Sequence, residues 1–481
     1  MQLINLLNKI EVFNDITQYL KAEVTKICYD TNENLKGSIF FCLRGTNTDG
    51  HDFLQQAKEK GALFAVVEKC NTEVEIPQIL VQDTRVAFAL VCANFYHNPA
   101  KKLKIIGVTG TNGKTSTCLI LKEIFMHAGK VVGVIGTLGY YINNESFSYN
   151  LTTPDPIKLH EIFAAFVEAG VEYVFMEVSA HAIYYKKIVG IHFKMAVLTN
   201  ITQDHLEFFK NMDNYANTKL SFLNAKSVNM VIANVDDRYF HKIEKQNLIT
   251  YGIKNPAESF AIDISLKIGS SDYTLNIMDN VMNISTHLSG LFQVYNALAA
   301  VTVAVLCGLE SQTIQSALNQ IEDINGRFHV IHTKKGEIVL DFAHTPDGLE
   351  NILNSVKMAS FKEIICVFGC NGNRDRLKRP MMGKIAQEYC EKVFLTSDNP
   401  RYENPELIAR DILQGVSQKE KFVIETDRKK AILYALTELE EDKIVVICGK
   451  GGEKYQDING VQVPYEDMTE IDHIIKLLNL N

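Results

Sequence analysis

The sequence lacks paired cysteines. Its ten cysteines are scattered singly, the two nearest one another are Cys366 and Cys370, and no Cys-x-x-Cys occurs. This spacing indicates neither a zinc site nor a small disulfide framework. We therefore expect reduced thiols and a cytoplasmic protein.

An excess of positive charge is also absent. The chain has 49 Lys and Arg against 57 Asp and Glu, which gives a formal net charge of −8. A chain of this charge could attract nucleic acid or an anionic membrane only through a local basic patch, and the sequence contains no such patch. We expect neither as a partner.

Long apolar runs are missing as well. The most apolar stretch, Ala297–Leu309, is shorter than the ~20 residues that span a bilayer. It continues an amphipathic pattern from Leu291, which predicts a buried core helix. The first twenty residues have no basic segment followed by a continuous apolar segment, so we expect no signal peptide.

The 481 residues exceed what one hydrophobic core organises, and the sequence pattern divides them into three predicted α/β domains. Residues 1–98 form a small N-terminal domain, residues 99–326 a central P-loop domain with a mostly parallel sheet, and residues 327–481 a Rossmann-like C-terminal domain with a second open parallel sheet. The predicted strands are Ser38–Leu43, Ala62–Glu68, Lys104–Gly110, Val131–Thr137, Tyr173–Val178, Met195–Ile201, Met230–Val235, Glu337–Ala343, Glu363–Gly369, Lys392–Ser397, Phe422–Glu425 and Lys443–Cys448.

The sharpest motif is GVTGTNGKTS, which spans Gly107–Ser116 between a predicted strand and a helix over Lys114–Ala128. Such a glycine loop turns backbone N–H groups toward phosphates, its lysine reaches the β- and γ-phosphates, and its threonine ligates Mg²⁺. The strict pattern has glycine where this chain has Val108, but strand, loop and helix follow in the required order. The predicted ATP-binding residues are Gly110, Thr111, Asn112, Gly113, Lys114, Thr115 and Ser116.

Other polar residues follow the next strands. Glu177 ends an apolar strand, where a P-loop enzyme needs a carboxylate for Mg²⁺. His205 follows the next strand end, at the edge of the sheet where ligands bind in open α/β folds, and Lys219 lies on a predicted helix. Taken singly, each could equally be a solvated surface residue.

These motifs together resemble the Mur ligases, and most closely the UDP-N-acetylmuramoyl-tripeptide synthetases that add meso-diaminopimelate. The resemblance covers residues 20–480 and rests on motifs in the family order: GTNGKT, MEVSAH, TNITQDHLEFF, YANTKLSF, VYNALAA, NGR, DFAHTPDGLE, FGCNGNRDRLKRP, SDNPR and GKGGEKYQ. It implies ATP- and Mg²⁺-dependent amide formation. The D-Glu carboxylate of UDP-N-acetylmuramoyl-L-Ala-D-Glu would become an acyl phosphate, which the amine of the added amino acid attacks. A monomer is the family default.

The resemblance also assigns roles to residues at the nucleotide. Lys114, Glu177, His205 and Lys219 would be catalytic, and Thr115, Glu177, His205 and a carbamylated Lys219 would hold Mg²⁺. Asn296 resembles the residue that contacts adenine, although a helix asparagine between tyrosine and alanine could equally be a satisfied core group. His344 and Asp347 resemble the ATP contacts that the C-terminal domain contributes.

The choice of amino acid depends on Ser397-Asp398-Asn399-Pro400-Arg401. In the family this form is typical of enzymes that add meso-diaminopimelate, and a guanidinium at Arg401 could bind its second carboxylate in a bidentate manner. By itself the motif could equally be a turn after a strand. The remaining substrate-binding residues implied by the resemblance are Thr152, Thr153, Ser179, Lys187, Arg374, Gly449 and Glu453.

Some positions depart from the family pattern. Tyr29-Asp30-Thr31-Asn32 replaces the usual uridine-binding Asp-Ser-Arg, and Lys187 replaces an arginine. Two alternative functions stay open. One is a related ligase that adds L-lysine, extends the peptide further or adds glutamate to folate. The other is a P-loop NTPase that uses hydrolysis for switching or transport.

Overall fold

The structure is a computed structural model that describes residues 1–46, 48–149, 151–324, 326–360 and 362–480. Its residues group into two compact units. The first contains Met1–Gly107, Val131–Lys194 and Ala225–Asn229, and the second contains Val108–Lys130, Met195–Asn224 and Met230–Asn481. Strand β5 (Lys104–Thr109) begins in the first unit and ends in the second. Asn325, in the predicted domain boundary, lies outside the described residues.

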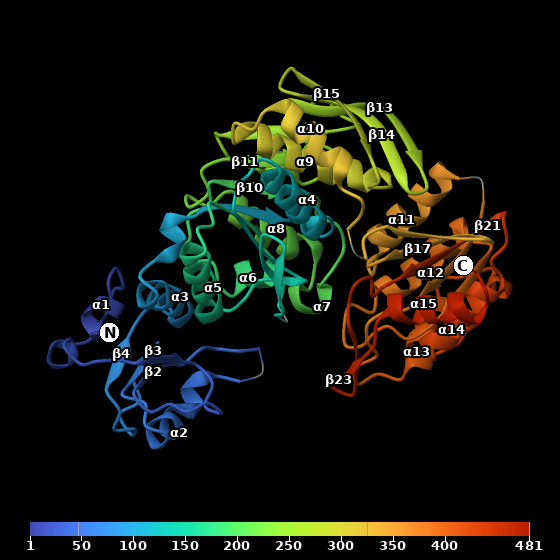
Figure 1. Cartoon of the computed structure of the whole chain (residues 1–481). Helices are drawn as coiled ribbons and strands as arrows, with labels where there is room; N and C mark the ends of the chain where they lie inside the picture. Colours follow the sequence, from blue (N-terminus) through green and yellow to red (C-terminus); the bar gives the residue numbers. More distant parts are fainter. Residues whose placement is uncertain (47, 150, 325, 361, 481) are drawn as a thin grey trace. The chain divides into compact units, whose positions relative to one another are not determined.

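The first unit begins with a parallel sheet in the strand order β1-β2-β3-β4 (Figure 1). Side chains alternate between its two faces, because Ile39 and Phe41 pack with helix α3 while Phe40 packs with helix α2. The elements are α1 (Leu3–Leu6), β1 (Lys26–Cys28), β2 (Ser38–Phe41), α2 (Leu54–Glu59), β3 (Phe64–Val67), β4 (Gln78–Leu80) and α3 (Thr84–Phe95), with 3₁₀ turns at Thr17–Tyr19, Gly50–Phe53 and Pro99–Lys102.

The rest of the first unit has strands in the order β9-β6-β7-β8. β9 and β6 are parallel, whereas β7 and β8 add to this edge as an antiparallel hairpin. Short loops at the carboxyl ends of β6 and β9 place polar side chains next to one another. The elements are β6 (Val132–Gly136), β7 (Gly139–Ile142), β8 (Glu145–Phe147), α5 (Pro156–Glu168), β9 (Tyr173–Glu177) and α6 (Ala180–Tyr184).

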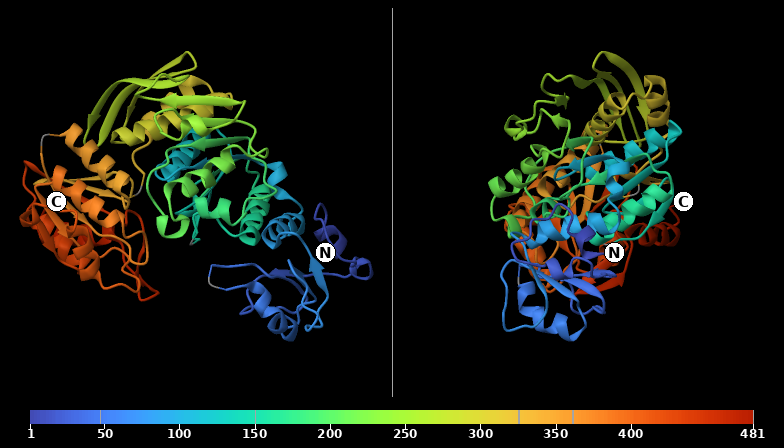
Figure 2. Two further views of the ribbon diagram at one scale, coloured as in Figure 1. Left: turned by 180° about the vertical axis from the view of Figure 1, so that it is seen from behind. Right: turned by 90° about the vertical axis from the view of Figure 1, so that its left-hand side faces the viewer.

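The second unit continues with strands in the order β10-β11-β12-β13-β14-β15. Strands β10 to β13 are parallel to one another, and β13, β14 and β15 form an antiparallel meander. Helices α4 and α9 pack side by side (Figures 1 and 2), and α9 is buried along most of its length, as expected of a core helix. The elements are α4 (Lys114–His127), β10 (Met195–Leu198), α7 (Leu206–Phe209), α8 (Met212–Leu223), β11 (Val231–Asn234), β12 (Leu248–Gly252), β13 (Ser259–Lys267), β14 (Ser270–Ile277), β15 (Asn280–Thr286), α9 (Leu291–Leu306) and α10 (Ser311–Gln320), with a 3₁₀ turn at Phe240–Lys242.

The C-terminal part of the second unit is a sheet in the order β16-β17-β21-β18-β19-β20, with helices on both faces. Successive residues of β21 face opposite sides of the sheet: Val446 packs with α11, α12 and α13 on one face, and Val445 packs with α14 and α15 on the other. The elements are β16 (His329–Thr333), β17 (Gly336–Asp341), α11 (Pro346–Ala359), β18 (Glu363–Phe368), α12 (Lys378–Tyr389), β19 (Lys392–Leu395), α13 (Pro405–Leu413), a 3₁₀ turn (Lys419–Lys421), β20 (Phe422–Ile424), α14 (Arg428–Thr437), β21 (Lys443–Cys448), β22 (Tyr455–Ile458), β23 (Val461–Pro464) and α15 (Asp467–Leu477).

All twelve predicted strands are present. Most are shorter than predicted at one or both ends, β21 has the predicted bounds, and β17 begins one residue before the predicted Glu337. The expected mostly parallel central sheet and parallel C-terminal sheet are present, with antiparallel strands added at their edges. β16 pairs antiparallel with β17, and β13, β14 and β15 form an antiparallel meander that the apolar runs did not predict. An edge strand covered on one face alternates polar and apolar residues, so it produces no continuous apolar run.

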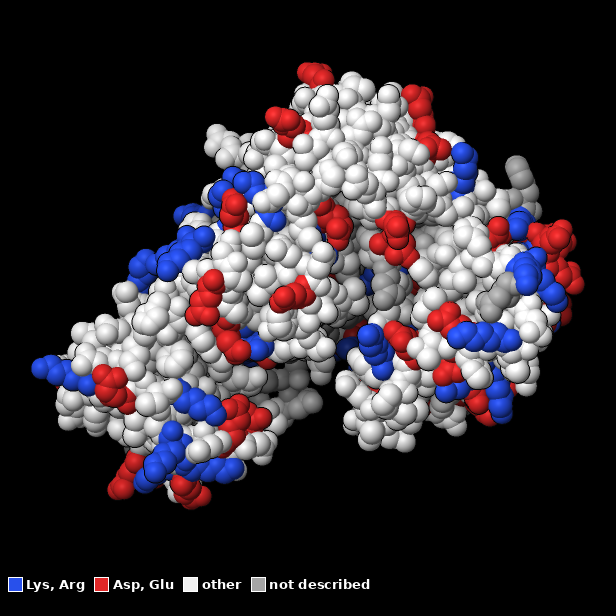
Figure 3. All heavy atoms as spheres, viewed as in Figure 1, with Lys and Arg blue, Asp and Glu red and all other residues white. Residues whose placement is uncertain are grey.

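The distribution of surface charge and the state of the cysteines are as the composition predicts. Basic and acidic side chains lie close to one another over the C-terminal sheet in the face shown in Figure 3. All ten cysteines are free thiols. Within the described ranges, every helix is too short or too polar to cross a membrane.

A buried ion pair joins α14 to α15. Arg428 and Asp467 have side chains 1% and 0% exposed, and the Arg428 Nη2 lies 2.6 Å from the Asp467 Oδ2. The same guanidinium donates to the Cys448 carbonyl at 2.9 Å, and the Tyr465 hydroxyl donates to Asp467 at 3.0 Å. These bonds fix the carboxyl end of β21, which precedes Gly449.

We predict that Asp467→Asn lowers the free energy of unfolding by about 3 kcal/mol, because it leaves the buried Arg428 guanidinium without a counter-ion. Urea unfolding followed by circular dichroism measures this change. Glu406→Gln is the matched control, since its partner Arg410 is 67% exposed and exposed pairs contribute little. Equal effects of the two substitutions would contradict the prediction.

Candidate active site

The glycine loop occupies the turn between β5 and α4. Gly110 has a φ of +154° and Gly113 a φ of +85°, conformations that glycine adopts without the strain a side chain would cause. The Lys114 ammonium bends back over the loop and donates to the carbonyls of Gly110 and Thr111 at 3.0 and 2.8 Å. The ammonium therefore lies against the backbone of the loop, which is the loop that presents N–H groups to phosphates in P-loop proteins.

Residues that follow β10 hold this loop in place. The Thr111 N–H donates to the Asn200 carbonyl at 2.8 Å, and the Asn112 N–H donates to the Asn200 Oδ1 at 2.9 Å. The Thr199 hydroxyl donates to the Asn112 carbonyl at 2.6 Å. These three hydrogen bonds fix the backbone of Thr111 and Asn112. The loop geometry is therefore preorganised before a nucleotide binds.

The amine of Lys219 lies beneath the loop. Its side chain, on α8, is 1% exposed, and Nζ donates to the Gly110 carbonyl at 2.7 Å. Burial lowers the pKa of Lys219 well below its usual value, and the nearby Lys114 charge lowers it further, although the Asp204 carboxylate acts in the opposite direction. The environment thus favours a neutral amine at Lys219.

Asp204 and His205 lie after β10 in the same unit. The His205 Nε2 is 3.2 Å from the Asp204 Oδ2. Burial tends to raise the pKa of Asp204, but the positive charges of His205 and Lys378 outweigh burial and bring this pKa below its usual value. Asp204 therefore stays ionised and supplies negative charge among these basic groups.

The loop after β17 reaches the glycine loop. The Asn112 Nδ2 donates to the Asp347 Oδ2 at 2.7 Å, which places Asp347 beside the glycine loop. Burial raises the pKa of Asp347. Burial also lowers the pKa of His344 to about 4, with a smaller contribution from Lys378, so this imidazole is neutral at pH 7. Its Nδ1 lies 2.9 Å from the Phe342 carbonyl.

Asn296 lies on α9 with its side chain buried against the start of α4. Its Nδ2 donates to the Gln293 Oε1 at 2.9 Å, and its Oδ1 accepts from the Thr117 hydroxyl at 3.5 Å. A Cβ at Gly113 would lie 2.4 Å from this Oδ1. The structure thus places Asn296 directly behind the glycine loop, with its hydrogen bonds made inside the protein.

A second cluster gathers at the carboxyl ends of β18, β19 and β21. The Asn399 Nδ2 donates to the Glu453 Oε2 at 2.9 Å, and the buried Lys450 ammonium donates to Asn399 and Glu453 at 3.1 and 2.5 Å. Gly449 approaches Asp398 so closely that a Cβ would lie 2.4 Å from the Asp398 Oδ2. The sequence reasoning predicted these residues except Lys450.

Arg374 and Arg401 extend this cluster. Burial lowers the pKa of Arg401, and the positive charge of Arg374 lowers it further. The ion pairs of the two guanidiniums are long: Arg374 lies 3.4 Å from Glu207, and Arg401 lies 3.8 Å from Asp457. Two guanidiniums that affect one another, each with only a long ion pair, form an arrangement suited to an anionic ligand.

In the first unit, Glu177 lies at the end of β9 among hydroxyl groups. The Thr137 N–H and hydroxyl donate to its two oxygens at 2.9 and 3.1 Å. Thr137 also lies 3.1 Å from Thr152, and Thr153 donates to the Glu177 carbonyl at 2.8 Å and accepts from the Ser179 N–H at 3.1 Å. Four predicted residues thus meet here, together with the unpredicted Thr137.

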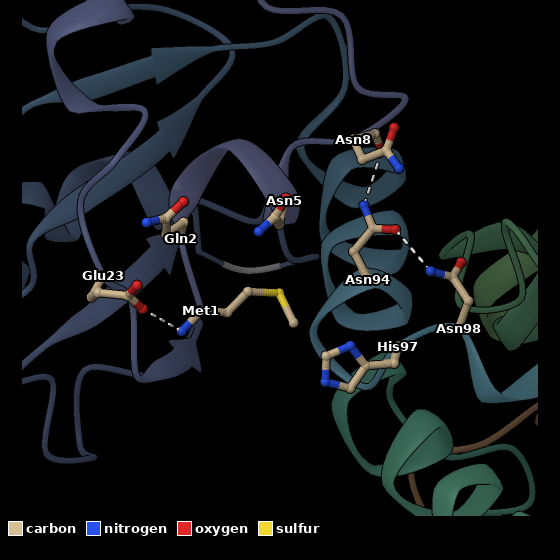
Figure 4. A pocket seen from close by; sticks show the side chains of 8 residues that line it. All are labelled: Met1, Gln2, Asn5, Asn8, Glu23, Asn94, His97 and Asn98. Atoms are coloured by element: carbon tan, nitrogen blue, oxygen red, sulfur yellow. Dashed lines mark hydrogen bonds and ion pairs between the residues drawn. The ribbon is translucent and has the colours of Figure 1, made fainter.

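Lys187 lies in a different group of the first unit. Its ammonium is 2.7 Å from the Asp155 Oδ1, and the Tyr29 hydroxyl donates to the Asp155 Oδ2 at 3.1 Å. The first unit also has a cavity of 770 Å³ near its N-terminus. Figure 4 shows Asn94 bonded to Asn8 and Asn98, and Met1 bonded to Glu23, so the polar groups there bind one another. None of the predicted site residues lines this cavity.

Among the described residues, no cluster of three or more His, Cys, Asp and Glu side chains is arranged to hold a metal ion. The predicted magnesium ligands include only two residues of these types, Glu177 and His205, and complete the set with Thr115 and a modified Lys219. The predicted ligand set therefore does not require a cluster of three or more His, Cys, Asp and Glu side chains.

Comparisons with known proteins cover nearly the whole chain. Residues 23–96, 108–304 and 326–451 match the families described as Mur ligase family, catalytic domain; Mur ligase middle domain; and Mur ligase, glutamate ligase domain. The UDP-N-acetylmuramoyl-L-alanyl-D-glutamate--2,6-diaminopimelate ligase of Aquifex aeolicus is 38% identical over 96% of both chains, and that of Clostridium tetani is 37% identical over 99% of this chain and 100% of its own. The chain belongs to the Mur ligase family.

A solved structure extends the likeness to three dimensions. It is described as a UDP-N-acetylmuramoyl-L-alanyl-D-glutamate--2,6-diaminopimelate ligase, is 27% identical, covers 100% of both chains and has a TM-score of 0.71. The predicted α/β fold of three Mur ligase domains is therefore confirmed.

Several residues near the Mur ligase motifs were not predicted. Arg327 donates to the Thr115 hydroxyl at 3.4 Å and lies 4.2 Å from the centre of the Phe342 ring. Gln203 donates to Asp375 at 2.9 Å. Arg327 and Asp375 belong to the motifs NGR and NRDRLKRP, so the sequence marked both positions. The motifs did not indicate which residues they contact.

We predict that Gly113→Ala weakens ADP binding at least tenfold, because a Cβ would collide with Asn296 and change the loop that receives the phosphates. Isothermal titration with ADP measures this loss. Gly129→Ala is the matched control, since Gly129 also has a positive φ, +73°, but has open space around it. If both variants bind ADP equally well, the loop does not depend on this close contact.

Proposed function

We propose that the chain is an ATP-dependent ligase that adds meso-2,6-diaminopimelate to UDP-N-acetylmuramoyl-L-Ala-D-Glu, in the synthesis of peptidoglycan precursors. The new amide joins an amino group of the amino acid to the D-Glu side-chain carboxylate. Its curated relatives carry the names of ligases for these substrates. The three-domain Mur ligase fold agrees with this activity.

The observation that carries the proposal is the paired guanidiniums of Arg374 and Arg401 beside Asn399 and Glu453. Meso-diaminopimelate has a second carboxylate where lysine has only hydrogen, and that carboxylate would relieve the repulsion between the two guanidiniums. Glu453 provides a carboxylate for an ammonium group of the same ligand. A pocket for lysine would have no use for a guanidinium pair, which disfavours the lysine-adding alternative.

The glycine loop is the proposed ATP site. ATP supplies the phosphoryl group that activates the D-Glu carboxylate as an acyl phosphate, with release of ADP. Two anions must approach one another in this step, so Lys114 and the loop N–H groups have to offset their repulsion. Asn296, His344 and Asp347 complete the proposed ATP contacts. The hydrolytic NTPase alternative has no need for the guanidinium pocket.

The proposed Mg²⁺ ligands are Thr115, Glu177, His205 and Lys219, and Mg²⁺ would neutralise charge on the phosphates. A cation at a lysine would repel the metal, whereas the buried environment of Lys219 favours the neutral amine. A neutral amine reacts with carbon dioxide to give a carbamate and a proton, which turns the side chain into an oxygen ligand. The donor set after that modification fits Mg²⁺.

Thr152, Thr153, Ser179 and Lys187 are the proposed contacts to the muramoyl-peptide. Their hydroxyl groups and ammonium can donate hydrogen bonds to peptide and phosphate oxygens. The domain boundaries at residues 98 and 326, the monomeric state and the cytoplasmic location stay predictions.

We predict that phosphate release from ATP and Mg²⁺ with the UDP-linked dipeptide requires meso-diaminopimelate, and that Arg401→Ala lowers kcat/KM for this amino acid at least 100-fold. Two charge-assisted hydrogen bonds are lost, each of about 1.5–3 kcal/mol. A coupled phosphate assay with meso-diaminopimelate, L-lysine or no amine measures both. Release with lysine alone would refute the pocket assignment, and release without amine would favour the NTPase alternative.

We predict that Lys219→Ala abolishes ligation and that short carboxylates such as formate or acetate restore part of it, because they can replace the carbamate oxygens. The same phosphate assay, with product identified by mass spectrometry, gives the result. Lys226→Ala, at an exposed lysine, serves as the control and should retain full activity. Full activity of Lys219→Ala would rule out the proposed role.

A further inference from the structure

Arg379 is the largest of the fully buried side chains in the described parts of the chain. On α12, its guanidinium donates to both carboxylate oxygens of Glu403, at 2.9 and 3.0 Å. It also donates to Asp411 at 2.9 Å and to the Asn371 carbonyl at 3.2 Å. A buried arginine needs such acceptors, and those of the two Nη groups come from three separate segments, whereas the buried Nε has no partner among the described residues.

Two of these segments carry the guanidiniums of the proposed amino acid pocket. Residues 371–374 form the turn after β18 and end at Arg374, while residues 399–403 follow β19 and contain Arg401. The turn is joined to the second segment by further bonds: the Gly372 N–H donates to the Asn399 carbonyl at 2.9 Å, and the Asn373 N–H donates to Glu403 at 2.5 Å. A Cβ at Gly372 would lie 1.9 Å from the Pro400 carbonyl oxygen, so the two backbones are in direct contact.

Electrostatic repulsion opposes the close approach of these two segments. Arg374 and Arg401 repel one another, which is why Arg374 adds to the effect of burial in lowering the pKa of Arg401. Their ion pairs, at 3.4 and 3.8 Å, are longer than close hydrogen bonds. Without a ligand, repulsion tends to separate the turn from the second segment, and the Arg379–Glu403 pair opposes that separation.

We propose that Arg379 and Glu403 are positioning residues that set the distance between Arg374 and Arg401, and thereby the preference for an amino acid with a second carboxylate. This inference rests on the proposed function. Neither positioning residue has to touch the substrate. The pair acts by holding two backbone segments together, so that both guanidiniums meet the same carboxylate without a rearrangement on binding.

The test compares Glu403→Gln and Arg379→Lys with the wild-type chain in the phosphate assay. Each variant keeps the size of the side chain and removes the bidentate ionic contact. We expect KM for meso-diaminopimelate to rise about tenfold, which corresponds to one charge-assisted hydrogen bond, while KM for ATP and kcat stay within about twofold. The ratio of kcat/KM for meso-diaminopimelate to that for L-lysine should fall by the same factor.

Arg376→Gln is the matched control. Arg376 donates to the same Asp411, at 2.8 and 3.2 Å, but its side chain is 65% exposed. This control should retain the wild-type KM. If either test variant fails to fold, Glu403→Asp replaces it, because this side chain keeps the charge and is too short for the bidentate contact.

The outcomes separate the inference from the function on which it rests. A wild-type chain that does not use meso-diaminopimelate would refute the proposed function. A wild-type chain that uses it, with test variants of unchanged KM, would refute the positioning role alone. A loss of kcat with equal rises in KM for both ATP and the amino acid would also refute the inference, because it would mean a general structural role.

Discussion

Crowding of like charges is the constraint on which the second unit depends. Lys114 and Lys219 both donate to the Gly110 carbonyl, and Arg374 and Arg401 lie near enough to affect one another. Phosphates and carboxylates of the proposed ligands require such cationic sites, although the whole chain carries a net charge of −8. Like charges placed close together repel one another, so other bonds within the protein have to hold these residues in place.

The fold provides this restraint in two ways. At the glycine loop, backbone and side-chain oxygens of residues 199 and 200 fix the loop, and the Gly110 carbonyl accepts hydrogen bonds from both Lys114 and Lys219. At the proposed amino acid pocket, the buried guanidinium of Arg379 joins the two backbone segments through the Glu403 carboxylate and the Asn371 carbonyl. In both places, hydrogen bonds and ionic contacts within the protein hold the backbone next to the cations. Preorganisation of this kind reduces the entropy lost on binding.

The sequence predicted those parts of the structure that local patterns determine. The buried parallel strands are continuous apolar runs, and the glycine loop needs particular residues in a fixed order, so both were predicted at nearly the observed positions. The antiparallel edge strands were missed because their alternating residues produce no such run. Arg379 was missed for a different reason: in KRP it resembles a solvated charge, and only contacts with residues 403 and 411, distant in the sequence, show that it is buried.

Contacts distant in the sequence also connect two departures from the family pattern. Tyr29 and Lys187 are two of the positions that the sequence marks as departures, and both side chains bind the carboxylate of Asp155, one at each oxygen. An arginine fork could occupy both oxygens alone, whereas a lysine is a point charge that can bind one closely and leave the other to a neighbour. The Tyr29 hydroxyl fills that place, and burial together with Asp155 raises the pKa of Tyr29, which keeps it a donor. Tyr29 and Lys187 therefore share one carboxylate, which a guanidinium could have bound by itself.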